Sequence, residues 1–333
     1  MRAAVVHRHG GPDTLSLETV ADPSPQPNAV LVEIQAVALN FVDLLVIQGA
    51  YQFLPKLPFI PGKLPTGIVA AVGTGIEDLK VGDRVQTLAE HGGYASKIAV
   101  PAKDCIRLPE SMSFTAAAAM ALAYDTAWFA ICERARAKPG ENMLVLGASG
   151  AVGLAAIQLG KAYGLKVLAA INGPDKKALV TDAGADAVID LSAPDLRESL
   201  RAQVFAATAD HGADVILDML GGDVFDAAIR AVAWSGRMII VGFAAGRIPT
   251  VKINYVMLKN MELTGLQVSD YRKRRPDLMR HCYSEIFRLF EEGRLKPPPT
   301  QTFKLEEVKD TLQQFKDRRL SGRLVLLPAE AGA

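Results

Sequence analysis

A glycine-rich turn, Gly147-Ala148-Ser149-Gly150, stands between the apolar run 143–146 and the helically spaced segment 152–163. Small residues in such a turn let a pyrophosphate approach the backbone, and the N–H groups at the start of the helix bind it. The strand–turn–helix context therefore predicts a dinucleotide site. Its contacts are expected from Ser149, Gly150, Ala151 and Val152. The match is imperfect, because Ala148 replaces the first glycine of the usual fingerprint, and a turn that serves only close packing is the alternative.

The tip of the second predicted strand, 166–170, decides which dinucleotide the site favours. NAD sites usually carry an acidic residue about twenty residues after the turn, where it accepts a hydrogen bond from the ribose 2′-OH. Here no acid stands at the tip, and Lys176 and Lys177 follow shortly after it. A cation at this place could pair with a 2′-phosphate, and no carboxylate would repel that phosphate. The sequence therefore favours NADPH over NADH, with one of the two lysines expected to be merely solvated.

Residues that could hold a metal or act as a nucleophile are scattered along the chain. Catalytic zinc sites need thiolate, imidazole and carboxylate ligands, yet no histidine or cysteine belongs to a cluster. These residues are His7, His9, His91, His211, His281, Cys105, Cys132 and Cys282. The turn also lacks the spacing of a nucleophile elbow and the Gly-Lys-Ser/Thr of a P-loop. The sequence therefore predicts neither a metal-polarised carbonyl nor a serine nucleophile.

Two patterns of secondary structure would position these residues. Short strands bounded by glycine or proline fill the first hundred residues and indicate a β-rich, barrel-like unit. The expected strands are 30–37, 67–73, 82–85 and 94–100. An Ala-rich helical stretch covers 113–133, and strands then alternate with helices from 143 to 241. This alternation is typical of a parallel sheet covered on both faces, so the predicted fold class is α/β with a doubly wound sheet.

The tail from about Gly265 adds helices over 278–291 and 305–315 and a last strand over 323–327. A terminal strand that follows helices could complete the N-terminal β unit, which would make the first domain discontinuous. We therefore expect a β-rich catalytic domain of residues 1–122 and 265–333. A dinucleotide-binding domain of residues 123–264 would be inserted into it.

Composition bounds the class of protein and its surroundings. The 333 residues carry 37 Lys and Arg against 36 Asp and Glu, a net charge of +1 that argues against a nucleic-acid binder. The basic cluster Arg272–Arg275 is interpreted as a solvated helix start rather than a polyanion site. Three scattered cysteines suit a reducing compartment, and neither a signal peptide nor a membrane-spanning segment is recognisable. We expect a cytoplasmic protein with no nucleic-acid or membrane partner.

Several motifs, spread over nearly the whole chain, resemble those of one family. They are Ala38–Asp43, Pro58–Gly62, Gly92–Ala95, Tyr124–Ala127, Gly221–Phe225, Val241–Pro249, Leu258–Asn260 and Ser321–Arg323. With the glycine turn, they make the chain similar to the zinc-independent quinone oxidoreductases of the medium-chain dehydrogenase/reductase superfamily, the group that includes ζ-crystallin. One departure is the segment Pro61–Gly67, which lacks the acid of the Pro-Gly-x-Glu/Asp-x-Ala-Gly pattern found in many relatives and has Pro65 in addition. It alters a loop near the expected cleft, so the substrate stays open.

The resemblance implies a discontinuous GroES-like catalytic domain, an inserted Rossmann domain, a homodimer and NADPH as hydride donor. Asn40 matches the position at which zinc relatives have a cysteine ligand, and the resemblance places Asn40 and Thr126 beside the nicotinamide. It also places Tyr51 near the substrate. The other implied cofactor contacts are Asn172 at the strand tip, Gly242 and Phe243 beside the cofactor, and Arg323 closing over it.

These observations favour an NADPH-dependent, zinc-independent reductase that transfers hydride to a small-molecule electron acceptor, a quinone or a similar activated enone. Hydrogen bonds from Tyr51 or Asn40 would stabilise the charge that develops on the acceptor oxygen. No side chain is an obvious proton donor, so water is expected to protonate the product. One alternative is a 2-enal or enoyl-thioester reductase, with Lys56 and Lys63 near an anionic acceptor. The other is a cofactor-binding protein with little turnover.

Overall fold

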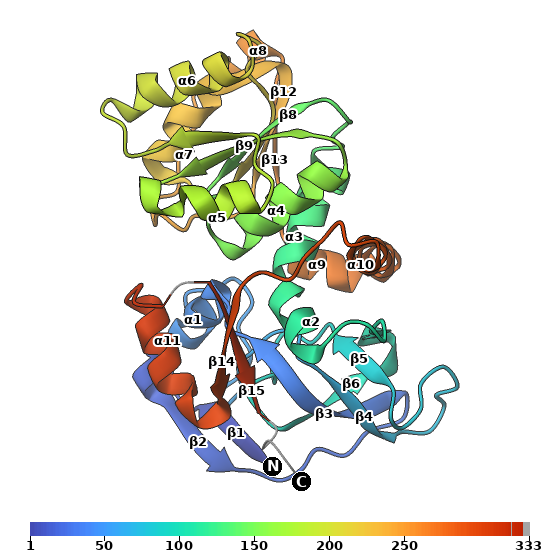
Figure 1. Ribbon diagram of the computed structural model, residues 1–333. Coiled ribbons are helices and arrows are strands. Elements are labelled where there is room, and N and C mark those ends of the chain that lie inside the picture. Colours follow the sequence, from blue (N-terminus) through green and yellow to red (C-terminus); the bar gives the residue numbers. More distant parts are fainter. Residues whose placement is uncertain (321, 329–333) are drawn as a thin grey trace. The chain divides into compact units, whose positions relative to one another are not determined.

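The computed structural model describes residues 1–320 and 322–328. They divide into two compact units, one made of Met1–Leu122 with the chain after Lys296, and the other of Ala123–Lys296. The first unit is β-rich, and the second contains a parallel sheet with helices around it (Figure 1). The predicted α/β class is therefore confirmed.

The β-rich unit is built on a seven-stranded sheet in the order β14-β15-β3-β4-β5-β7, with β6 also paired to β3. Its strands are β3 (Ala29–Ala38), β4 (Thr66–Val72), β5 (Arg84–Thr87), β6 (Lys97–Pro101), β7 (Cys105–Arg107), β14 (Thr300–Lys304) and β15 (Arg323–Leu327), and a separate pair is β1 (Arg2–Val6) with β2 (Leu15–Thr19). Strand β15 pairs antiparallel with β3, with Val325 opposite Ala38. The prediction that the terminal strand completes the N-terminal β unit is therefore confirmed.

The described part of this unit contains the α-helices α1 (Phe41–Gln48), α2 (Phe114–Met120) and α11 (Val308–Lys316). Helix α1 was not expected, because its eight residues stand among short strands. Asn40 caps its first turn, and its last turn ends at Gly49, whose φ of 75° is the left-handed conformation that glycine adopts easily at helix ends. Leu44 and Ile47 on this helix are buried in the same apolar cluster as Leu326 of β15. The helix is thus fixed beside the strand that closes the sheet.

The α/β unit contains six parallel strands in the order β10-β9-β8-β11-β12-β13. They are β8 (Asn142–Leu146), β9 (Lys166–Ile171), β10 (Ala187–Asp190), β11 (Ala213–Asp218), β12 (Val232–Ile240) and β13 (Glu262–Gly265). The chain leaves β8 in one direction through β9 and β10, and returns to its other side at β11. Ligands of doubly wound sheets bind at the carboxyl ends of the strands where the order reverses. That point lies between β8 and β11.

Helices connect these strands and cover the sheet. They are α3 (Ala123–Trp128), α4 (Ala151–Ala162), α5 (Lys177–Asp182), α6 (Leu196–Ala207), α7 (Gly222–Ala228), α8 (Asn254–Lys259), α9 (Val268–Arg274) and α10 (Pro276–Glu291), with a π-helical segment η3 (Phe129–Arg134). Helix α3 packs on α4, and α6 packs on α7. The predicted helix 196–207 agrees with α6 at both ends, because its apolar residues recur at helical spacing.

The helical stretch predicted over 113–133 is interrupted. Helix α2 ends at Met120, and Leu122, with φ of 62°, separates it from α3, where the second unit begins. Within the described residues, no single helix is long and apolar enough to cross a membrane. The helical segments Phe114–Met120 and Ala123–Arg134, taken together as a bent pair, are long and apolar enough by length and composition alone.

The second domain boundary differs from the expected one. Residues 265–296, assigned from the sequence to the β-rich domain, lie in the α/β unit, which ends at Lys296. The reason is that α10 packs on α3 and that Arg272 of α9 forms an ion pair of 2.6 Å with Asp125 of α3. The interpretation of Arg272–Arg275 as a solvated helix start is therefore wrong for Arg272, whose side chain is only 3% exposed.

Candidate active site

The glycine turn leaves β8 and leads directly into α4. Gly147 has a φ of 77°, and the N–H of Ala148 donates to the carbonyl of Ala170 at 3.0 Å, which ties the turn to the neighbouring strand β9. Gly150 is the N-cap of α4 and offers no side-chain bond to the first turn. The first N–H groups of a helix have no acceptor within it, so those of Ala151 and Val152 suit an anion.

Close packing demands glycine most strongly at one position of this region. A Cβ at Gly153 would lie 2.5 Å from the carbonyl oxygen of Gly147 and 2.6 Å from Cα of Ala148, so only glycine lets α4 begin this close to the turn. At Gly150 the nearest atom would be 3.3 Å away, and this residue is exposed. Close packing therefore constrains Gly153 more than the exposed Gly150.

The tip of β9 brings three predicted residues to the same edge of the sheet. Asn172, Lys176 and Lys177 are exposed, and they lie between the end of β9 at Ile171 and the start of α5 at Lys177. The sequence analysis overlooked Asp175, whose carboxylate oxygen lies 2.7 Å from where a Cβ of Gly173 would stand. The tip thus carries two cations and one carboxylate, and the expectation of a tip without an acid is wrong.

Gly242 and Phe243 lie at the same carboxyl edge, beyond β12. The N–H of Gly242 donates to the backbone carbonyl of Asp218 at 3.2 Å, and the Phe243 ring, 38% exposed, lies 3.0 Å from where a Cβ of Gly221 would stand. Since Asp218 pairs with Leu146 across β11 and β8, these residues are close to the glycine turn. The structure therefore brings together the predicted contacts on the turn, on the β9 tip and after β12.

Asp218 is a residue of this edge that the sequence analysis missed. Its Oδ1 accepts hydrogen bonds of 2.9 Å from the N–H groups of Leu220 and Gly221, while its buried Oδ2 has no partner among the described residues. Burial raises the pKa of Asp218, and the two backbone N–H groups oppose that rise. The carboxyl shapes the turn after β11, and the apolar strand before a Gly-Gly pair was the signal that could have pointed to it.

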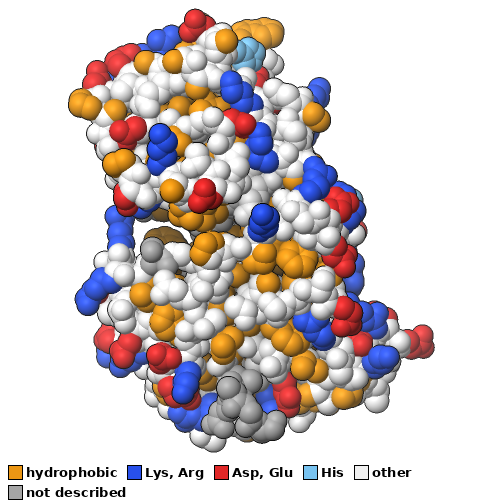
Figure 2. Space-filling view, in the orientation of Figure 1, with side chains coloured by type: hydrophobic (Ala, Val, Ile, Leu, Met, Phe, Trp, Pro, Cys, Tyr) orange, Lys and Arg blue, Asp and Glu red, His pale blue; other side chains and the backbone are white. Residues whose placement is uncertain are grey.

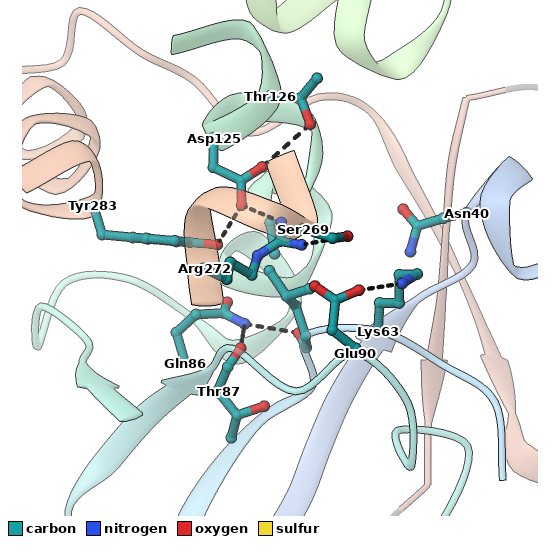
Figure 3. A network of polar contacts seen from close by, with 12 residues as sticks. Asn40, Lys63, Gln86, Thr87, Glu90, Asp125, Thr126, Ser269, Arg272 and Tyr283 are labelled. Carbon is teal, nitrogen blue, oxygen red and sulfur yellow. Dashed lines mark hydrogen bonds and ion pairs between the residues drawn. The ribbon is translucent and has the colours of Figure 1, made fainter. Parts of the chain in front are cut away.

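Thr126 lies on α3 of the α/β unit, beside a buried ion pair. Its side chain is largely buried and donates to Oδ1 of Asp125 at 3.4 Å (Figure 3). Oδ2 of the same carboxylate accepts from Arg272 at 2.6 Å and from the Tyr283 hydroxyl at 3.3 Å. This network fixes the start of α3, and Thr126 with it.

In the β-rich unit, the Asn40 amide is bonded at both ends to other protein groups. Its Oδ1 accepts from Arg323 at 2.8 Å, and its Nδ2 donates to the carbonyl of Ala38 at 3.1 Å and to Asp43 at 3.3 Å. An amide nitrogen has two hydrogens, and both are therefore directed at protein acceptors. This geometry favours a positioning role for Asn40 over a hydrogen bond to the acceptor.

Arg323 is likewise held within the β-rich unit rather than extended toward a ligand. Besides Asn40, its guanidinium donates to the carbonyls of Ala119 at 2.8 Å, Leu39 at 3.2 Å and Ala121 at 3.1 Å. The side chain is buried and joins β15 to the ends of β3 and α2. These bonds do not support the expectation that Arg323 closes over the cofactor. Ser321 of the same motif lies outside the described residues.

Tyr51 borders a buried charged cluster in the same unit. Its ring centroid lies 5.4 Å from Nζ of Lys63, which forms an ion pair with Glu90 (Figure 3). Nearby, Asp43 accepts a 2.9 Å hydrogen bond from the Tyr94 hydroxyl. Burial raises the pKa of Asp43, against the opposing effect of the Lys63 cation, and burial also raises the pKa of Tyr94.

Comparisons with known proteins agree with this arrangement. Residues 151–284 match the family model for a zinc-binding dehydrogenase, and residues 26–110 match that for an alcohol dehydrogenase GroES-like domain. Quinone oxidoreductase-like protein 2 of Bos taurus is 36% identical over 94% of this chain and 88% of its own length. The chain belongs to the quinone oxidoreductase group of the medium-chain dehydrogenase/reductase superfamily. Its β-rich unit is thus GroES-like, its parallel-sheet unit is a Rossmann domain, and the protein is an oxidoreductase.

Two further members of this group are similar to the chain, one in sequence and one in fold. The quinone oxidoreductase of Mus musculus is 35% identical over 82% of this chain and 82% of its own length. The crystal structure of the Escherichia coli quinone oxidoreductase, complexed with NADPH, is 28% identical, covers 98% of this chain and all of that one, and has a TM-score of 0.90.

The name of the first family model implies zinc, but the residues of the present protein do not fit that metal. Among residues 1–320 and 322–328, no group of three or more His, Cys, Asp and Glu side chains could hold a metal ion. The amide oxygen of the buried Asn40 already accepts a hydrogen bond from the Arg323 cation, and Lys63 supplies an ammonium, which has no lone pair to offer. The described residues therefore do not fit a zinc ion.

Proposed function

We propose that the protein is an NADPH-dependent, zinc-independent reductase that transfers hydride to a quinone or a similar activated enone. The observation that carries this proposal is the carboxyl edge of the Rossmann sheet. There the N-terminus of α4, the two lysines after β9 and the residues after β12 converge. The relative from Escherichia coli that is solved with NADPH supports the same cofactor.

The residues at this edge fit a phosphorylated dinucleotide. Ser149, Gly150, Ala151 and Val152 would hold the diphosphate, because the helix start presents unbonded N–H groups and Gly150 is exposed. Asn172, Lys176 and Lys177 would face the adenosine end, and Gly242, Phe243 and Thr126 would complete the contacts. Bound NADPH supplies the hydride, so the protein's own task is to bind, orient and exclude water.

The acceptor is proposed to be apolar and electron-poor. No metal ligand set that would polarise a simple ketone is present in residues 1–320 and 322–328, so we propose an acceptor that is itself activated. The segment after Tyr51 presents exposed apolar side chains, Phe53, Leu54 and Leu57, with exposed fractions of 39%, 42% and 41%.

Two measurements on the purified protein test the proposal. A fluorescence titration should show tighter binding of NADPH than of NADH. Oxidation of NADPH should then be followed with a panel of quinones, alkenals and enoyl thioesters, of which quinones are expected to react fastest. Binding without turnover of any acceptor would instead support a cofactor-binding protein with little activity.

The lysines at the β9 tip lead to a prediction about cofactor choice. Replacing both Lys176 and Lys177 by alanine is expected to weaken NADPH binding about tenfold, roughly 1.4 kcal/mol, because a 2′-phosphate would lose its cations. NADH binding should stay within about twofold. Asp175→Asn is the matched variant, since removing the carboxylate should strengthen NADPH binding. An equal loss for both dinucleotides in the double variant would contradict this assignment.

We also propose a homodimer that uses the edge of the Rossmann sheet. Strand β13 lies at the end of the strand order, and an edge strand exposes backbone groups that a second copy can pair. Apolar side chains at least 66% exposed come from the same part of the chain: Trp234, Ile248, Ile253, Met257 and Leu258. Light scattering should give a dimer for the wild type and a monomer for Ile253→Lys/Met257→Lys. A wild-type monomer would refute the proposal.

The remaining partners follow from charge and cysteine usage. On the face shown in Figure 2, basic and acidic side chains are interspersed rather than gathered into one basic stripe. This agrees with the net charge of +1 and supports a protein without a nucleic-acid partner. No disulfide joins Cys105, Cys132 and Cys282, which supports our proposal of a cytoplasmic location.

A further inference from the structure

Lys63 is a buried cation whose role the proposed cofactor site leaves unexplained. Its side chain is 3% exposed, and its ammonium pairs with the carboxylate of Glu90, which is 24% exposed. Removing an ammonium from water costs several kcal/mol unless a partner compensates it. Lysine is therefore seldom buried for packing alone, and a buried lysine at the edge of a substrate surface is a candidate for chemistry.

An aromatic and apolar surface adjoins this ammonium. Nζ of Lys63 lies 5.4 Å from the centroid of the Tyr51 ring, and that ring meets Phe53 edge-on, with 6.3 Å between centroids. Leu54 and Leu57, both exposed, continue the apolar segment. A planar, apolar acceptor would lie against such a surface, and its oxygen is the polar atom that a cation beside the surface would meet.

The other charged and titratable groups around Lys63 complete its setting. Besides Glu90, the Asp43 carboxyl is close enough for the Lys63 cation to oppose the rise of its pKa. His91 follows Glu90, and desolvation and the Lys63 cation lower its pKa, while Glu90 raises it. Tyr94 bonds to Asp43, farther along the same network. Carboxylates therefore keep an ammonium at this position compensated, and the ammonium has N–H groups beyond the one that Glu90 uses.

We propose that Lys63 is the catalytic acid that donates a proton to the acceptor oxygen, with Glu90 as the residue that positions it. This inference rests on the proposed reductase function. Hydride adds two electrons and one hydrogen to the acceptor, which leaves a negative charge on its oxygen. The N–H bond of Lys63 then breaks as the O–H bond of the hydroquinone or enol forms, and the resulting amine regains its proton from water.

The roles assigned from the sequence change accordingly. The sequence analysis expected water to protonate the product directly. In the present proposal Lys63 donates this proton and regains one from water. Asn40 holds the start of α1 and the Arg323 guanidinium instead of contacting the acceptor. The exposed side chains Phe53, Leu54 and Leu57 provide the apolar surface for the acceptor, and the Tyr51 ring carries the ammonium over its face.

The test compares Lys63→Met and Lys63→Arg with Lys80→Met, a control at an exposed lysine of the same unit. General acid catalysis contributes about 100-fold or more, so kcat with a reactive quinone should fall by that factor in Lys63→Met. The solvent deuterium isotope effect of the wild type should disappear. Lys63→Arg keeps the charge without a transferable proton and should lose kcat as well. NADPH affinity and the melting curve of Lys80→Met should match the wild type.

A second readout does not depend on turnover. 4-Nitrophenolate carries the oxyanion that the ammonium would stabilise, so it should bind the wild type and Lys63→Arg about tenfold more tightly than Lys63→Met. Equal phenolate affinity, or a kcat of Lys63→Met close to that of the wild type, overturns the proposal. If the wild type binds NADPH but reduces no acceptor, the proposed function fails, and the phenolate titration alone decides on Lys63. Should Lys63→Met not fold, Lys63→Arg and Glu90→Gln take its place.

Discussion

Gly153→Ala is expected to weaken NADPH binding about tenfold or more. The added methyl would stand 2.5 Å from the carbonyl oxygen of Gly147 and 2.6 Å from Cα of Ala148, both backbone atoms that cannot rotate away. Overpacking of this kind costs about 1–3 kcal/mol, and each 1.4 kcal/mol corresponds to about tenfold in affinity. The helix start must therefore move away from the turn that is proposed to hold the diphosphate. A fluorescence titration with NADPH measures the change.

The matched control is Gly265→Ala at the end of β13. No atom lies within 4 Å of a Cβ at that position, and its φ needs no glycine, so cofactor affinity and stability should be unchanged. Circular dichroism should confirm that Gly153→Ala remains folded. Wild-type affinity for NADPH in a folded Gly153→Ala protein would show that the diphosphate does not lie at this turn.

Arg272→Met is expected to lower the free energy of unfolding by about 3–5 kcal/mol. The substitution leaves the Asp125 carboxylate, which is fully buried, without its cation. Removing one partner of a buried ion pair has this large effect because the remaining charge has neither water nor a counterion. The Tyr283 hydroxyl, 3.3 Å from the same oxygen, is neutral and cannot replace the guanidinium. Urea unfolding measures the difference.

Arg274→Met serves as control, because it lies on the same helix α9. Its side chain is 78% exposed and 3.9 Å from Asp270, and exposed pairs contribute at most about 1 kcal/mol. The double variant Asp125→Leu/Arg272→Met should regain part of the lost stability, since it removes both charges. Equal small losses in Arg272→Met and Arg274→Met would mean that the buried pair does not hold α3 to α9.

The alternation of strands and helices made the Rossmann sheet predictable from the sequence. Five of its strands contain the short apolar runs that were predicted, and the longer helices repeat their apolar residues at helical spacing. The range 196–207 was predicted without error for this reason. Strand β13, with the sequence Glu-Leu-Thr-Gly, has no such run and was not predicted. Helix α1 was missed because eight residues are too few for a clear period. The boundary at Lys296 was missed because it depends on the pairing of Arg272 with Asp125, 147 residues apart.

The candidate site was predictable where its residues are neighbours in sequence. The turn from Gly147 to Val152 and the lysines after β9 are local patterns, and the structure brings them to one edge. The pairing of Lys63 with Glu90 is not local, and nothing in either segment indicates the other. The same holds for Arg323, whose four acceptors lie in parts of the chain that are more than two hundred residues earlier.

The pairing of β15 with β3 has a consequence for synthesis on the ribosome. The Rossmann unit is one continuous stretch, Ala123–Lys296, so all of its residues are translated before the closing strand of the β-rich unit. Until then, the edge of β3 that β15 will cover has no neighbour and is open to mispairing. The nascent chain should therefore acquire its nucleotide-binding half first, and a premature stop codon just before Arg323 should yield a folded Rossmann half attached to an aggregating remainder.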